Sequence, residues 1–112
     1  MKKLLLLTFL ALSTQCHEFI GKHLLGQYSD GCVYYLKDKN YVTKVMTQGI
    51  EEAGATILSV HSEDFPGGGY SIVFILSESH ATIHAYPEYN ACFIDLFTCG
   101  TTCDPVKFHY RS

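Results

Sequence analysis

The chain has 112 residues, enough for one small domain, and 47% of them are apolar. That content, with eight tyrosines and seven phenylalanines, favours a folded domain and excludes an intrinsically disordered chain. The net charge is −3, and no cluster of Lys and Arg lies beyond the N-terminus, so nucleic acid is not an expected partner.

The N-terminus has the layout of a secretory leader. Lys2 and Lys3 precede an apolar run at residues 4–12, which is too short to span a bilayer stably. The pattern predicts a leader over residues 1–16, followed by a domain over residues 17–112, and export to a periplasmic or extracellular location. The alternative is a leader-like extension on a cytoplasmic protein.

The remaining elements follow from hydrophobic periodicity. Residues 18–28 predict a first strand, and apolar residues at helical spacing predict a helix near residues 39–53, with Asn40 as its N-cap and Gly54 at its end. Four more strands are expected at residues 55–61, 70–76, 80–86 and 91–98. This order predicts an α+β fold, a two-layer sandwich of an antiparallel sheet with a helix packed on one face. Apolar side chains on the uncovered face favour a homodimer.

Four reactive side chain types gather within 22 positions: the carboxylate of Glu78, the hydroxyl of Ser79, the imidazole of His84 and the thiol of Cys99. A serine hydroxyl that reaches the preceding carbonyl can convert the amide into an ester, and a histidine can move the protons. Strand alternation places His84 on the opposite face from Ser79, so periodicity does not pair them. Each residue also has an ordinary structural explanation in a turn, a strand or a core.

The five cysteines do not settle a pairing. Loss of Cys16 with a leader would leave four, which an exported chain could join as two disulfides. Cys99 and Cys103 are close enough to form one. The paired cysteines and histidine partner of a zinc site are missing, so no metal is expected.

Several motifs, in order, resemble the bacterial S-adenosylmethionine decarboxylases, pyruvoyl-dependent enzymes made as self-cleaving proenzymes. The similarity runs from about Gly21 to Pro105. The motifs are Gly21-Lys22-His23-Leu24-Leu25, Gly54-Ala55-Thr56-Ile57, Ser77-Glu78-Ser79-His80, Thr82-Ile83-His84, Tyr86-Pro87-Glu88-Tyr89 and Ile94-Asp95-Leu96-Phe97-Thr98-Cys99-Gly100.

The resemblance assigns the processing residues. It implies self-cleavage between Glu78 and Ser79, with Ser79 becoming a pyruvoyl group that forms a Schiff base with the substrate. His84 matches the histidine that assists processing, and Ser71 matches a serine of the same step. Cys99 matches the thiol that protonates the substrate carbon after CO₂ leaves.

The resemblance also assigns substrate-binding residues. Glu88 matches the acid that binds the ribose hydroxyls, and Phe65 matches the aromatic residue that stacks on adenine. The implied reaction is decarboxylation of S-adenosylmethionine to the aminopropyl donor for spermidine. Two alternatives stay open: a pyruvoyl-dependent ornithine or arginine decarboxylase, and an inactive homologue that binds a partner.

The chain departs from the family pattern at both ends. The family is cytoplasmic, whereas the N-terminus indicates export, and in an oxidising compartment a Cys99–Cys103 disulfide would remove the proton donor. The family also continues beyond Pro105 with a further helix and strand, so a less covered sheet is expected here.

Overall fold

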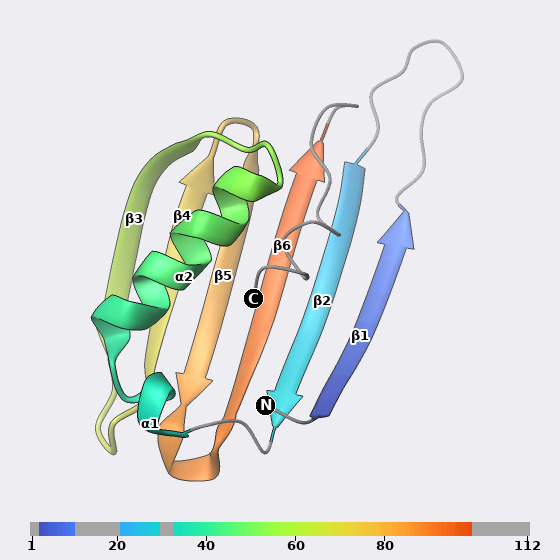
Figure 1. Cartoon of the computed structure of the whole chain (residues 1–112). Helices are drawn as coiled ribbons and strands as arrows, with labels where there is room; N and C mark the ends of the chain where they lie inside the picture. The colour runs from blue at the N-terminus through green and yellow to red at the C-terminus, as the bar shows by residue number, and fades with distance from the viewer. Residues whose placement is uncertain (1–2, 11–20, 30–32, 100–112) are drawn as a thin grey trace, which may run out of the picture.

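The computed structural model describes residues 3–10, 21–29 and 33–99. In this part of the chain six strands form one antiparallel sheet with the order β1-β2-β6-β5-β4-β3 (Figure 1). The elements are β1 (Lys3–Leu10), β2 (Gly21–Ser29), α1 (Val33–Leu36), α2 (Lys39–Glu52), β3 (Ile57–Asp64), β4 (Tyr70–Leu76), β5 (Ser79–Tyr86), the 3₁₀ turn η1 (Pro87–Tyr89) and β6 (Ala91–Cys99).

Helix α2 covers one face of the sheet, over β3, β4 and β5 (Figure 1). Alternate strand residues point at it because side chains along a strand have a period of two, while the helix buries one stripe. The buried apolar residues are Leu24, Val42, Met46, Ile50, Ala53, Tyr70, Ile72, Phe74, Leu76, Ala81, Ile83, Ala85, Cys92, Ile94 and Leu96. The predicted α+β two-layer sandwich is confirmed.

The N-cap of α2 differs from the prediction. Asp38, not Asn40, is the cap: its backbone is extended, and its carboxylate accepts a hydrogen bond of 3.0 Å from the backbone N–H of Tyr41. Asn40 already lies inside the helix, where it cannot satisfy the first free N–H groups. At the other end Gly54 has a φ of 93°, a left-handed conformation that glycine adopts readily after a helix.

Strand β4 has the predicted bounds, and β5 and β6 each differ by one residue. Strand β3 differs most: it begins at Ile57 and continues to Asp64, because its pairing with β4 extends to Asp64 opposite Tyr70. As an edge strand with exposed side chains, β3 lacks the hydrophobic pattern that marks a strand end.

Residues Lys3–Leu10 form β1 at the other edge, paired with β2 from Lys3 opposite Ser29 to Leu10 opposite Lys22. A short apolar run suits an edge strand as well as the core of a leader, so the sequence pattern fits both. Cleavage of a leader stays a prediction, and its residues 11–16 lie outside the described part. No described helix is both long and apolar enough to cross a membrane.

The face of β2, β6, β5 and β4 that points away from α2 is called the open face here. Its side chains are His23, Leu25, Gln27, Ser71, Val73, Ile75, His80, Thr82, His84, Phe93, Asp95, Phe97 and Cys99. Leu25, Ile75 and Phe93 are each more than 40% exposed. Apolar surface and titratable groups therefore share one face.

Tyr70 gives a test of the α1–sheet contact. Its hydroxyl donates a 2.6 Å hydrogen bond to the backbone carbonyl of Leu36. Burial, followed by the charges of Cys92 and Asp38, raises the pKa of Tyr70 to about 12. Tyr70→Phe should lower the free energy of unfolding by about 1 kcal/mol at pH 7, measured by urea denaturation.

The pH dependence has a definite sign. Folding favours the neutral phenol, so its stabilisation is complete below the ordinary pKa of 10.0 and is lost as pH rises towards about 12. Tyr70→Phe should lose less stability than wild type between pH 9 and 11.5. The control is Tyr41→Phe, an exposed tyrosine, which should follow wild type. Equal pH profiles for wild type and Tyr70→Phe would contradict the assignment.

Candidate active site

The turn between β4 and β5 places a strained residue directly before Ser79. Leu76 pairs with Ser79, so Ser77 and Glu78 form a two-residue hairpin loop. Glu78 has a φ of 60°, in the left-handed region that costs a residue with a side chain about 1–2 kcal/mol. The Glu78–Ser79 peptide bond thus follows a backbone conformation that the sheet register imposes.

Cys99, at the end of β6, lies against this turn. Its thiol donates a hydrogen bond of 3.0 Å to the backbone carbonyl oxygen of Glu78. The hydroxyl of Ser79 lies 3.8 Å from the same sulfur, and a carboxylate oxygen of Glu78 lies 3.9 Å away. The structure therefore brings together Glu78, Ser79 and Cys99.

Ser71 and His84 form a second group on the open face. They are directly opposite in the β4–β5 register, and the Ser71 hydroxyl lies 2.6 Å from Nδ1 of His84. His84 is five residues along β5 from Ser79, a separation of about 16 Å at the usual rise of a strand. Within one chain, His84 does not lie beside Ser79.

Phe65 and Glu88 lie at the His84 end of the sheet. Phe65 begins the β3–β4 loop and is 39% exposed, while Glu88 is exposed in η1. Glycines of the same loop lie close to both side chains. A Cβ added to Gly67 would lie 3.6 Å from a carboxylate oxygen of Glu88, and a Cβ added to Gly69 would lie 3.6 Å from the ring of Phe65. In Figure 1 this loop and η1 are at the lower end of the sheet, opposite the β4–β5 turn.

A shallow hollow of about 280 Å³ lies on the open face between β2 and β5. Its lining includes Leu25, Gln27, Thr82, His84, Phe93 and Asp95. It connects the surface beside His84 with the centre of the sheet.

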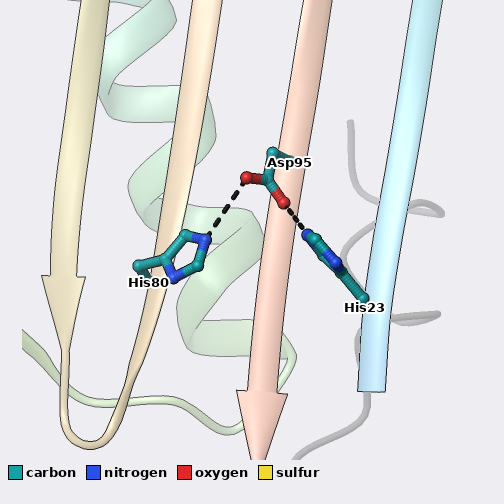
Figure 2. Close-up of side chains that lie close together, drawn as sticks. All are labelled: His23, His80 and Asp95. Atoms are coloured by element: carbon teal, nitrogen blue, oxygen red, sulfur yellow. Dashed lines mark hydrogen bonds and ion pairs between the residues drawn. The ribbon is translucent and has the colours of Figure 1, made fainter. Parts of the chain in front are cut away.

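The sequence pattern does not reveal a further cluster, which lies beside Phe97 on the open face. His23, His80 and Asp95 come from β2, β5 and β6, and both imidazoles point at the Asp95 carboxylate (Figure 2). These residues are far apart along the chain, so no local spacing reveals them. Their alignment appears only once the register is known, because His23 and His80 are both opposite Phe97.

Comparison with known proteins identifies the family. A family profile described as S-adenosylmethionine decarboxylase matches residues 22–111. The chain belongs to this family. The match covers the β4–β5 turn, Cys99 and the Ser71–His84 pair.

Curated relatives and a solved structure agree with that family. The chain is 40% identical over 86 residues to an S-adenosylmethionine decarboxylase proenzyme of Thermodesulfovibrio yellowstonii, covering 77% of this chain and 64% of the relative. It is 37% identical over 90 residues to an arginine decarboxylase proenzyme of Aeropyrum pernix, covering 79% and 68%. The chain thus spans about two thirds of these relatives' length.

The fold is similar to the crystal structure of the adenosylmethionine decarboxylase from Aquifex aeolicus VF5, with a TM-score of 0.69 and 26% sequence identity. That alignment covers 85% of this chain and 75% of the other. Family membership and the α+β fold therefore rest on sequence and structural comparison together.

Proposed function

We propose that this chain is a pyruvoyl-dependent S-adenosylmethionine decarboxylase that cuts itself between Glu78 and Ser79 and makes the aminopropyl donor for spermidine. The observation that carries the proposal is the contact of the Cys99 thiol with the Glu78 carbonyl, beside the Ser79 hydroxyl. An attack on that carbonyl needs a nucleophile and a donor for the developing oxyanion. Ser79 would supply the nucleophile, and Cys99 at the end of β6 the donor.

Self-cleavage would proceed through an ester of the Ser79 side chain. The Ser79 oxygen bonds to the Glu78 carbonyl carbon, the C–N bond breaks, and Ser79 gains a free amine with its side chain esterified. Loss of the Ser79 α-proton then breaks the Cβ–O bond and releases the Glu78 carboxylate. The resulting dehydroalanine tautomerises to an imine, and water replaces its nitrogen as ammonia to leave a ketone.

Residues around Ser79 fit the group that these steps would generate. The strained Glu78 destabilises the uncut chain, and the Cys99 thiol donates a hydrogen bond at the bond to be broken. A pyruvoyl ketone would supply an electron sink for decarboxylation. The Cys99 sulfur lies 3.8 Å from the Ser79 hydroxyl, close enough to act as the proton donor to a substrate carbon bound there.

The separation of Ser79 from His84 supports a homodimer. A two-fold axis parallel to the open face and perpendicular to its strands would place the Ser71–His84 end of one chain against the Glu78–Ser79–Cys99 end of its partner. The exposed Leu25, Ile75 and Phe93 give this contact apolar surface. We therefore assign His84 and Ser71 to the partner's cleavage site.

The same arrangement brings Phe65 and Glu88 to the partner's Ser79. An exposed aromatic ring beside a carboxylate suits a nucleoside, because the ring stacks on the base and the carboxylate accepts hydrogen bonds from the ribose hydroxyls. S-adenosylmethionine is accordingly the proposed substrate. No nucleic-acid partner is proposed.

A second candidate function is decarboxylation of arginine, since one relative of similar identity is named an arginine decarboxylase proenzyme. A guanidinium group would use the carboxylate of Glu88 but would not need a stacking ring at Phe65.

We place the enzyme in the cytoplasm, where the family acts, with β1 as part of the sheet.

Intact mass spectrometry tests self-cleavage. Wild type should give two fragments split after residue 78, and the smaller one, which begins at residue 79, should lack a free amino terminus. Ser79→Ala should give one uncut chain, because no hydroxyl is available to form the ester. Ser77→Ala, a serine of the same turn, is the matched control and should split as wild type does. An uncut wild-type chain would leave the inactive, partner-binding homologue as the better account.

Mixed assemblies test the dimer. Alone, Ser79→Ala should remain uncut, and His84→Ala should cut itself about 10²–10⁴-fold more slowly than wild type. When the two are coexpressed, the His84→Ala chain should split, because its partner supplies an intact His84. Coexpression of His84→Ala with a Ser79→Ala/His84→Ala double variant is the control, since no assembly then contains an intact His84. Failure of the first pair to split would place His84 outside the partner's site.

Release of ¹⁴CO₂ from carboxyl-labelled substrates separates the candidate activities. S-adenosylmethionine should be turned over, with arginine and ornithine inactive. Glu88→Gln should raise KM by about 10- to 100-fold, the loss of one or two charge-assisted hydrogen bonds. Phe65→Leu should raise KM for S-adenosylmethionine without affecting self-cleavage. Turnover of arginine that is insensitive to Phe65→Leu would favour the second candidate.

A further inference from the structure

We propose that His23, His80 and Asp95 form a binding site for one divalent transition-metal ion of the zinc class on the open face. The donor set is two imidazoles and a carboxylate. This proposal does not depend on the proposed function, because all three residues belong to one chain and none is assigned to cleavage.

The geometry of the cluster is close to that of a coordinated ion. One donor atom from each residue lies within 4.8 Å of the others. Nε2 of His80 is 3.2 Å from Oδ2 of Asp95, and Nε2 of His23 contacts Oδ1. Tetrahedral zinc ligands at their usual bond lengths are about 3.3 Å apart, so small side-chain rotations suffice.

The sheet holds the two imidazoles rigidly. His23 and His80 are both opposite Phe97 in the register, on either side of it. The His80 ring stacks on Phe97 with centroids 5.8 Å apart, and the His23 ring meets Phe97 edge-on at 5.9 Å. Neighbouring strands and a shared aromatic ring fix both Nε2 atoms, which lowers the entropic cost of binding an ion.

The negative charge and partial exposure of the cluster suit a cation. Figure 2 shows the Asp95 carboxylate between the two rings, with one oxygen directed at each. In the single chain these side chains are between 31% and 41% exposed, so solvent or another ligand can complete the coordination there. Two imidazoles with one carboxylate suit zinc, cobalt, nickel or copper better than magnesium or calcium, which prefer oxygen ligands.

A hydrogen-bonded bridge is the alternative, with each imidazole donating an N–H to the carboxylate. The two arrangements differ in protons, because metal ligation requires Nε2 of both rings to be unprotonated. A metal site therefore binds an added divalent ion and loses that binding when any of the three side chains is replaced, whereas a hydrogen-bonded bridge does not.

Cobalt titration of metal-stripped full-length protein, followed by visible absorption, and zinc titration calorimetry test the proposal. One ion per chain should bind to wild type and equally to Ser79→Ala. His23→Gln, His80→Gln and Asp95→Asn should each weaken metal binding by at least about 100-fold. Loss of an outer-shell partner alone usually lowers metal affinity by about 10- to 100-fold, and loss of a ligand should lower it at least as much. His61→Gln is the matched control, since His61 faces Glu63 in an exposed pair elsewhere, and it should bind as wild type does.

Binding that is equal in wild type, His23→Gln and Asp95→Asn would overturn the proposal and leave the bridge. So would an absence of binding in wild type. Cys99→Ser excludes a thiol ligand: loss of binding in this variant would also contradict the site. Mass spectrometry of the same samples shows self-cleavage separately, so a failed metal site and a failed processing reaction are distinguished. His23→Gln replaces a partly exposed residue, so it provides the test even if Asp95→Asn does not fold.

Discussion

The register of β5 between β4 and β6 is the constraint on which the rest of the structure depends. It sets Cys99 next to the β4–β5 turn, Ser71 opposite His84, and Phe97 opposite His80. Because successive side chains alternate between faces, a slip of one residue would turn the buried β5 side chains Ala81 and Ile83 to solvent and the histidines into the core. Hydrophobic burial against α2 therefore also holds the reactive groups in place.

Much of the fold could be predicted from local pattern. The helix, the strands β4, β5 and β6 and the turn at Ser77–Glu78 each produce a signal within ten or so residues. The edges of the sheet could not be assigned in this way. Strand β3 has exposed side chains and therefore no apolar alternation, and the apolar run in β1 has the same composition as a leader. What distinguishes these cases is pairing with a neighbour, which is not local.

The residues of the candidate site fall into the same two groups: those that a local motif identifies, and those that only strand pairing brings together. Glu78 and Ser79 are adjacent, and the family motif around them is sufficient to identify them from the sequence. The contact with Cys99 depends on strand pairing, whereas the distance from Ser79 to His84 follows from their spacing along β5. Alternation correctly places His84 on the opposite face from the buried β5 residues, but it cannot say that Ser71 is its neighbour. The cluster around Asp95 is further removed, because it needs three strands in register.

The two faces of the sheet carry different chemistry. The face under α2 is filled by apolar residues, and there burial raises the pKa of Cys92 to about 11, so that thiol stays neutral. The open face carries the histidines, Asp95 and Cys99 among exposed apolar residues. A surface that combines reactive groups with Leu25 and Phe93 would be poorly selective in open solvent. Covering it would exclude water from both ends of β5 at once and strengthen every hydrogen bond there. A contact that covered the open face would therefore stabilise the sheet and make the reactions of its side chains more selective.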